Sequence, residues 1–293
     1  MRIFTIVLFL FFFSKSSSQE KFEFFGALKL NASDKSVISY RLVLYEKKGR
    51  LDGYSITDLG GEHETKNTVT GYYNPKTKEI SFKEEAILYT KSRITSSMFC
   101  FINYTGKMKL ENENSKLTGN FKGLYQNKTK CIDGTITLIG SKKLYSLLGK
   151  INTKIQKTTK IDEVEKKKVN PISILDSLKV NNLIKGQNLN VFTKFNSIDI
   201  LIWDSKVEDG DMVNVYKNEV LVLQNYVLVN KKKKITINVE NGNNVFRIEA
   251  LNQGDLQLNT ASIELVDKER TFDLVSNLKT GESASITIIK VDQ

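Results

Sequence analysis

Segments in which apolar and polar residues alternate run through the first half of the chain. Alternation over about four to eight residues predicts half-buried β-strands. The segments are rich in β-branched and aromatic residues and are separated by Gly, Asn, Asp or Ser, which is typical of an antiparallel meander. Thr-Gly pairs inside the strands indicate bulges or sharp bends, and hence a sandwich or a partly closed barrel. The predicted strands span 22–30, 39–46, 52–57, 68–73, 79–82, 86–90, 99–110, 116–125 and 131–139.

A helical period follows residue 140. Between Lys142 and Lys157, apolar residues recur at spacings of three and four with lysines on the opposite face, which predicts one amphipathic helix. The charged stretch after this helix ends at Pro171, where we expect a domain connection. The strand pattern returns at Pro171 and continues to the end of the chain.

These patterns predict an all-β fold in two domains. An N-terminal antiparallel β-domain spans 19–140, a lysine-rich helical linker spans 141–170, and a C-terminal β-sandwich of about eight strands spans 171–293. A chain of 293 residues is long enough for each domain to bury a core of its own. Trp203, the only tryptophan, is the expected anchor of the sandwich core.

The C-terminal half contains three short motifs. They are Trp203-Asp204 followed by Asp209-Gly210-Asp211 and Val213, then Ala250, Asn252 and Gly254, then Asn259-Thr260-Ala261. Written as patterns, these motifs are W-D-x4-D-G-D-x-V, A-x-N-x-G and N-T-A. With them, the region from Asn196 to the end resembles an immunoglobulin-like module at the C-terminus of secreted and cell-envelope proteins of Bacteroidota. Leu258 stands where that module has Pro. The resemblance implies an envelope-facing β-sandwich and supplies no catalytic residue.

The first 18 residues are expected to be an export signal that is removed. Arg2 provides a positive charge, eleven apolar residues follow from Ile3 to Phe13, and small residues stand at 16–18. Eleven apolar residues are too few to span a bilayer, which needs roughly 20. We therefore expect an exported protein that does not span the membrane, located in the periplasm, at the outer-membrane periphery or outside the cell.

The net charge of +11 is concentrated in the segment from Ser141 to Val169, which contains nine lysines and three acids. An exported chain meets anionic glycans and envelope proteins, so we do not interpret this charge as a nucleic-acid footprint. The segment is either a solvated helix and linker or a docking strip for an acidic partner. The candidate docking residues are Lys166, Lys167 and Lys168.

Cys100 and Cys131 are the only cysteines. Export to an oxidising compartment favours a disulfide between them. The chain has no C-x-x-C motif, which favours a structural bridge over a redox-active one.

Residues typical of catalytic sites are scarce. His63 is the only histidine, so it cannot form a His-rich zinc site, and no G-x-S-x-G motif accompanies it. Glu84 and Glu85 are neighbours on a predicted strand and should point to opposite faces, whereas the two carboxylates of a glycosidase converge on one bond. The chain also has no phosphate-binding loop and no dinucleotide fingerprint, so we expect no cofactor.

Three classes of function remain. We favour a non-catalytic exported envelope protein that binds a protein or an anionic glycan through its β-domains, as an accessory subunit of an envelope assembly. A carbohydrate-binding module is an alternative, and an enzyme with an unfamiliar site is another. A carbohydrate-binding module would need a platform of exposed tyrosines, for which the candidates are Tyr72, Tyr73, Tyr104 and Tyr125. The partner and the oligomeric state stay open.

Acidic residues crowd around Gly210. Carboxylates at this density suit Ca²⁺, although Asp-Gly is also a frequent turn and the spacing differs from that of an EF-hand loop. Asp204, Asp209 and Asp211 are the candidate ligands.

Calcium binding by this loop predicts a change in melting temperature. A ligand that binds only the folded state stabilises it by about 2.7 kcal/mol at a hundredfold excess over its Kd. Millimolar Ca²⁺ should therefore raise the melting temperature by several degrees relative to EDTA, as followed by circular dichroism. Equal melting temperatures in Ca²⁺ and EDTA would leave these residues as a turn only.

Overall fold

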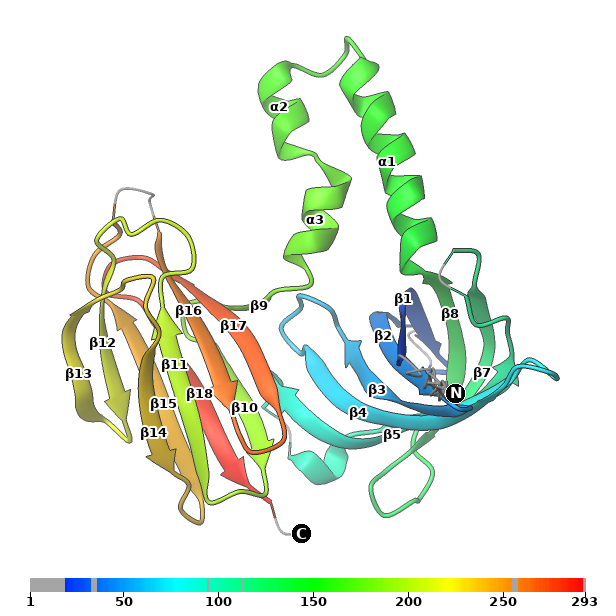
Figure 1. Cartoon of the computed structure of the whole chain (residues 1–293), viewed down its shortest axis with the longest axis horizontal. Coiled ribbons are helices and arrows are strands. Elements are labelled where there is room, and N and C mark those ends of the chain that lie inside the picture. Colours follow the sequence, from blue (N-terminus) through cyan, green and yellow to red (C-terminus); the bar gives the residue numbers. More distant parts are fainter. Residues whose placement is uncertain (1–18, 33–35, 94, 112, 255–257, 292–293) are drawn as a thin grey trace, which may run out of the picture.

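The computed structural model of the chain describes residues 19–32, 36–93, 95–111, 113–254 and 258–291 (Figure 1). The expected export signal at 1–18 lies outside these residues. Strands account for 55% of the structure and helices for 11%, which confirms the all-β class. Among the described helices, none has the length and apolar composition needed to cross a bilayer.

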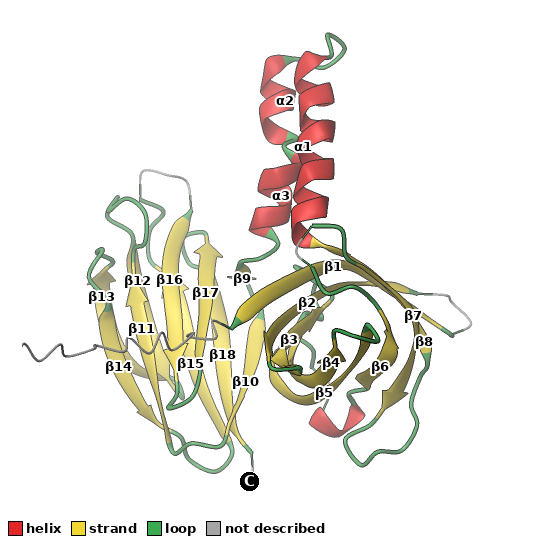
Figure 2. Ribbon diagram, turned by 45° about the vertical axis from the view of Figure 1, so that its right-hand side comes forward, coloured by secondary structure: helices red, strands yellow, loops and turns green. Residues whose placement is uncertain are grey.

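The N-terminal domain is a closed eight-stranded barrel, seen nearly end-on in Figure 2. Its antiparallel strands follow one another in chain order, and the last pairs with the first through Leu28 and Ile136. The two strands expected at 79–82 and 86–90 are one long strand, β5. The strands are β1 (Glu20–Leu30), β2 (Val37–Lys47), β3 (Arg50–Thr57), β4 (Thr65–Asn74), β5 (Glu79–Thr90), β6 (Phe101–Lys107), β7 (Lys116–Leu124) and β8 (Gly134–Gly140), with a 3-10 turn η1 (Ser96–Met98) before β6.

The barrel interior is packed by alternate residues of the strands. Phe24, Leu42 and Leu138 are among the buried apolar side chains of this core. Gly71, in one of the Thr-Gly pairs, lies where a Cβ atom would come within 2.1 Å of the carbonyl oxygen of Ser81. Only glycine permits this close approach of β4 and β5, which agrees with the expected coiling of the sheet.

The C-terminal domain is a sandwich of two five-stranded layers. One layer has the order β13-β12-β15-β18-β10 and the other β14-β11-β16-β17-β9. Apolar side chains from both layers form one buried core. The strands are β9 (Asn181–Leu183), β10 (Asn188–Thr193), β11 (Ser197–Trp203), β12 (Met212–Lys217), β13 (Val220–Val227), β14 (Lys233–Asn238), β15 (Asn243–Ala250), β16 (Asn259–Val266), β17 (Thr271–Leu278) and β18 (Ser283–Lys290).

Trp203 does not anchor the sandwich core, so that expectation is wrong. Along β11, Ile198, Ile200 and Ile202 are buried, and alternation places Trp203 on the other face. The Lys232 ammonium lies 4.4 Å from the centroid of its half-buried ring.

One continuous sheet joins the barrel to the sandwich. Strand β5 pairs with β10 through Thr90–Asn190 and Tyr89–Val191, which makes a single sheet of 13 strands. Tyr89 is part of the buried sandwich core.

The ammonium of Lys66, on β4, lies 4.1 Å from the Tyr54 ring centroid and 5.8 Å from that of Phe272. Burial lowers the pKa of Lys66 to about 8.

Three helices form an arm that projects from the two β-domains (Figures 1 and 2). They are α1 (Ser141–Lys157), α2 (Glu163–Lys168) and α3 (Pro171–Ser177). Helix α1 confirms the predicted helix, but none of its residues is buried. The strand pattern expected from Pro171 is wrong for 171–177, because the Asn170 side chain accepts the N–H groups of Ile172 and Ser173 and starts a helix with Pro171 in its first turn.

The structure confirms the disulfide between Cys100 and Cys131, whose Cα atoms are 6.0 Å apart. Both cysteines lie just outside the strands, in the connections that precede β6 and β8. Because the bridge joins two separate connections, it holds neighbouring parts of the barrel end together.

Loss of this bridge should destabilise the barrel. The bridge closes a separation of 31 residues. Replacing both cysteines with Ser should lower the free energy of unfolding by about 3–4 kcal/mol, because the unfolded chain gains conformational freedom. Urea unfolding measures the change. A double variant as stable as the native protein would contradict this role.

Candidate functional site

One end of the barrel opens into a cavity of about 430 Å³. This volume lies in the range of small-molecule sites, which occur in the mouths of barrels. The apolar wall consists of Leu30, Ile38, Phe99, Ile102, Phe121 and Ile132. The other lining residues are Thr57, Asp58, His63, Thr65, Ser92 and Cys100. We call this space the mouth cavity.

The disulfide forms part of the mouth cavity. Cys100 lines it, and the bridge crosses over Gly123 of β7. A Cβ atom on Gly123 would lie 2.5 Å from the Cys100 sulfur and 2.1 Å from the carbonyl oxygen of Ile132. Glycine at this position therefore lets the bridge lie directly against the barrel wall.

The polar residues of the mouth cavity come from the loop between β3 and β4, from the strand ends that flank this loop, and from the segment just after β5. The backbone N–H of His63 donates to the Asp58 carboxylate at 2.9 Å. The Thr65 hydroxyl donates to the carbonyl oxygen of His63 and lies 2.7 Å from the Thr90 hydroxyl. These bonds fix the backbone of the loop, while the His63 side chain is exposed at the rim.

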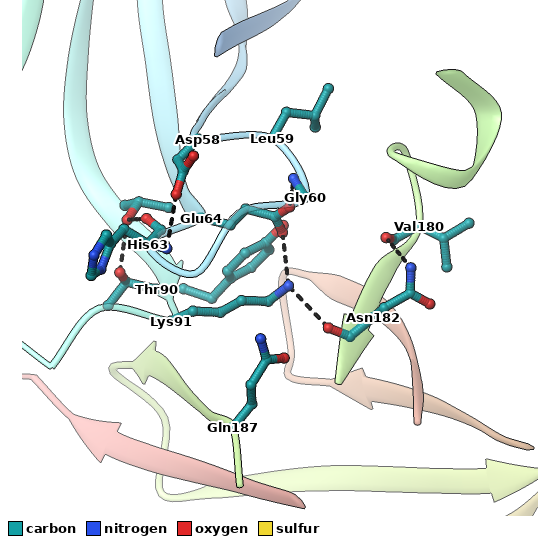
Figure 3. A network of polar contacts seen from close by, with 12 residues as sticks. Asp58, Leu59, Gly60, His63, Glu64, Thr90, Lys91, Val180, Asn182 and Gln187 are labelled. Atoms are coloured by element: carbon teal, nitrogen blue, oxygen red, sulfur yellow. Dashed lines mark hydrogen bonds and ion pairs between the residues drawn. The ribbon is translucent and has the colours of Figure 1, made fainter. Parts of the chain in front are cut away.

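A buried ion pair ties this loop to the sandwich (Figure 3). The Glu64 carboxylate accepts hydrogen bonds from the Gly60 N–H at 2.6 Å and the Tyr89 hydroxyl at 2.9 Å. The Lys91 ammonium lies 3.8 Å from Glu64 and donates to the carbonyl oxygen of Asn182, on β9, at 3.0 Å. Burial lowers the pKa of Lys91, and Glu64 opposes that shift. The loop that lines the mouth cavity is thus held by residues of both domains.

A buried carboxylate lies inside the barrel beside the mouth cavity. Glu84 accepts hydrogen bonds from the Tyr40 hydroxyl at 2.9 Å and the Ser55 hydroxyl at 2.5 Å. Its other oxygen accepts the N–H of Ile102, a residue of the cavity wall, at 2.8 Å. Burial raises the pKa of Glu84, and the hydrogen-bond donors, including the Asn67 side chain, oppose the rise.

Glu84 and Glu85 point to opposite faces of β5, as expected. Glu85 lies outside the barrel, where its carboxylate meets the Lys83 ammonium at 2.8 Å and the Thr70 hydroxyl at 2.7 Å. Glu84, by contrast, is only 5% exposed. The two carboxylates therefore cannot act on one bond.

Of the four tyrosines considered for a glycan platform, only Tyr72 is exposed. Tyr72 is 70% exposed, whereas Tyr104 is buried in the barrel core. Tyr73 follows Tyr72 on β4 and packs against the core, and Tyr125 is half-buried. The expected platform is not formed by these four residues.

The acidic loop of the sandwich is organised by hydrogen bonds between the three motifs. Asp211 is buried, and its carboxylate accepts the Thr260 N–H at 2.7 Å. The Asn252 side chain accepts the Met212 N–H at 2.7 Å and donates to the carbonyl oxygen of Gly210 at 2.7 Å. The Asn259 amide donates to the carbonyl oxygen of Met212 at 2.9 Å. Hydrogen bonds between the motif residues thus hold neighbouring loops together at one end of the sandwich.

The carboxylates of this loop influence one another. Burial, and then repulsion from Asp209 and Asp204, raises the pKa of Asp211 to about 6. Asp204 is also buried and accepts the Lys206 N–H at 2.8 Å. Within the described part of the chain, no group of three His, Cys, Asp or Glu residues could hold a metal ion. Calcium binding by Asp204, Asp209 and Asp211 stays a prediction for the melting experiment.

Of the three candidate docking lysines, the structure describes the side chain of Lys166 alone. Lys166 is 7% exposed, and its ammonium pairs with Glu163, three residues earlier in α2, at 2.6 Å. This pairing argues against docking through Lys166. The side chains of Lys167 and Lys168 lie outside the described residues.

Comparison with models of known protein families, with curated proteins and with solved structures finds no match to this chain. The likeness of the C-terminal motifs to a Bacteroidota module therefore stays a hypothesis.

Glu84 should give the protein a characteristic dependence of stability on pH. Because its pKa is raised above 4.5, folded Glu84 keeps its proton at pH values where the unfolded chain has released it. The free energy of unfolding should therefore fall, relative to Glu84→Gln, as the pH rises from 4.5 toward the raised value. Chemical denaturation over this pH range measures the difference.

Glu85→Gln is the matched control. Lys83 and Thr70 lower the pKa of Glu85, so its contribution to stability is present above 4.5 and is lost as the pH falls. The two variants should thus differ from the native protein with opposite pH slopes. Equal slopes would show that the buried carboxyl does not titrate as its surroundings indicate.

Proposed function

We propose that this chain is a non-catalytic binding protein that holds a small, largely apolar ligand in the mouth cavity. The observation that carries the proposal is the composition of the cavity, whose apolar wall has polar residues beside it. Such a site buries the body of a ligand by the hydrophobic effect and orients its polar end by hydrogen bonds. The Asp58 carboxylate, the His63 imidazole and the Ser92 hydroxyl belong to the polar side chains of this cavity.

The environment of the polar residues supports binding rather than catalysis. The Glu84 carboxylate receives donors at both of its oxygens, which suits a structural role. Asp58 is engaged by the backbone N–H of His63 rather than by its imidazole, so the pair does not form the aligned acid and base of a hydrolase.

Export remains part of the proposal. The bridge between Cys100 and Cys131 is the kind of bond that persists in an oxidising compartment, and it lies at the cavity itself. We therefore place the binding protein in the cell envelope or outside the cell, as a carrier or accessory subunit. A glycan ligand is less favoured, because the four candidate tyrosines form no exposed platform.

The proposal is tested with N-phenyl-1-naphthylamine, an apolar dye whose fluorescence rises on burial. The native protein should bind it saturably. Ile38→Trp places a bulky ring in the cavity wall and should weaken dye binding roughly tenfold or more, about 1.4 kcal/mol. Fluorescence titration gives the Kd of each protein.

Val37→Trp is the matched control for this titration. Val37 precedes Ile38 on β2 but is 68% exposed and does not line the cavity. The control should bind the dye like the native protein. Failure of the native protein to bind, or equal weakening by both variants, would overturn the assignment.

A further inference from the structure

Helix α1 of the arm carries five lysines and no acidic residue. Lys142 and Lys143 lie in its first turn, beside the positive end of the helix dipole, and Gly140 provides no side-chain cap. Lys150 and Lys154 are four residues apart, a spacing at which like charges repel each other on a helix. These charges lower the stability of the helix, whereas beside an anionic surface the same charges would be favourable.

Most of these lysines have no ion pair within the protein. In the described part of the chain, Lys142 is the one lysine of α1 that has an ion pair, with Glu113 at 3.6 Å. Lys143, Lys150 and Lys154 follow one another at spacings of seven and four, so they share one face of the helix. We call these three residues the lysine row. Lys150 and Lys154 are exposed, which leaves their ammonium groups accessible to an external anion.

Exposed apolar side chains border the lysine row. Leu147 and Ile151 lie beside it on the helix and are 42% and 48% exposed. The rest of the arm packs on the other side of α1, where the Tyr145 hydroxyl donates to the Asp176 carboxylate of α3. The lysine row and its apolar edge therefore form one surface that the arm itself does not cover.

We propose that this surface of α1 docks on an anionic phospholipid membrane. Helices that bind at a membrane interface combine lysines, which attract anionic headgroups, with apolar side chains that enter the boundary between headgroups and acyl chains. Helix α1 has both kinds of side chain next to each other. The arm projects from the two β-domains (Figures 1 and 2), so this surface can approach a membrane without rearrangement of either domain.

Two features favour lipid over an acidic protein or glycan. The residues from 141 to 179 include no arginine, the side chain that recognises carboxylates by paired hydrogen bonds of fixed geometry. Lysines are point charges on flexible stems, which suits mobile headgroups that present no single geometry. Leu147 and Ile151 favour lipid as well, because a membrane offers an apolar layer in which they can be buried.

The test is co-sedimentation of the full chain with lipid vesicles. The native protein should bind vesicles of equimolar phosphatidylcholine and phosphatidylglycerol, bind pure phosphatidylcholine far more weakly, and dissociate as salt is added. Lys150→Gln combined with Lys154→Gln should weaken binding to the anionic vesicles roughly thirtyfold. Since Gln favours helix nearly as well as Lys, α1 should be retained, which circular dichroism checks.

Lys231→Gln combined with Lys233→Gln is the matched control, because it removes the same charge from exposed lysines of the sandwich. This control should bind the anionic vesicles like the native protein. Equal weakening by the two double variants would assign the binding to net charge rather than to α1. That result, or a native protein that does not bind the anionic vesicles at low salt, would overturn the proposal.

A fluorescent reporter in the apolar edge distinguishes lipid from other polyanions. Ile151→Trp is made in a Trp203→Phe background, which removes the only native tryptophan. Its emission should shift to the blue when anionic vesicles are added. Val207→Trp in the same background should show no shift, since Val207 is exposed in the loop before β12. Binding that depends on Lys150 and Lys154 without a blue shift would overturn the assignment to lipid and point to an acidic protein or glycan.

Discussion

The pairing of β5 with β10 is the contact on which the rest of the structure depends. Strand β5 closes the barrel with its first half and continues as the neighbour of the sandwich with its last residues. Tyr89 shows the result most clearly, because it belongs to a barrel strand, packs in the sandwich core and donates to Glu64. Without this pairing, Glu64 and Lys91 would lose the surroundings that allow two charges to be buried together.

The pairing of β5 with β10 also determines how the walls of the mouth cavity are fixed. Rim residues that lie on a loop would ordinarily be mobile, but the loop between β3 and β4 is bonded to Tyr89 and, through Lys91, to Asn182 of the sandwich. Ser92, in the cavity wall, accepts a hydrogen bond from the Asn190 side chain. A binding site whose walls are fixed from two sides loses little conformational freedom when its ligand enters.

Much of the strand arrangement was predictable because alternation is a local property of the chain. Closure of the barrel was not, since pairing of β1 with β8 depends on the coiling of all the strands between them. Helix α3 has a local signal in Asn170-Pro171, a cap followed by a first-turn proline, but a proline that ends a charged stretch is also typical of a domain connection. The expectation that Trp203 anchors the core rests on its size, whereas the strand alternation assigns it to the face opposite Ile200 and Ile202.

The mouth cavity was harder to predict than the fold. Its wall is assembled from residues as far apart in sequence as Leu30 and Ile132, and each of them is an ordinary apolar residue in or next to a strand. No spacing relates them until the strands are closed into a barrel. The cysteines predict a bridge, but the strand pattern places both of them inside strands, at 99–110 and 131–139, whereas the bridge joins the two connections before β6 and β8.

The arm connects the two domains in sequence, but it is not what holds them together in space. The chain leaves the barrel at Gly140, runs through α1, α2 and α3, and returns at β9 and β10, the strands that contact the barrel. A cut at the tip of the arm, near residue 160, would therefore leave the shared sheet and the Lys91–Asn182 contact intact. Barrel and sandwich made as separate chains should therefore keep the surfaces through which β5 and β10 pair.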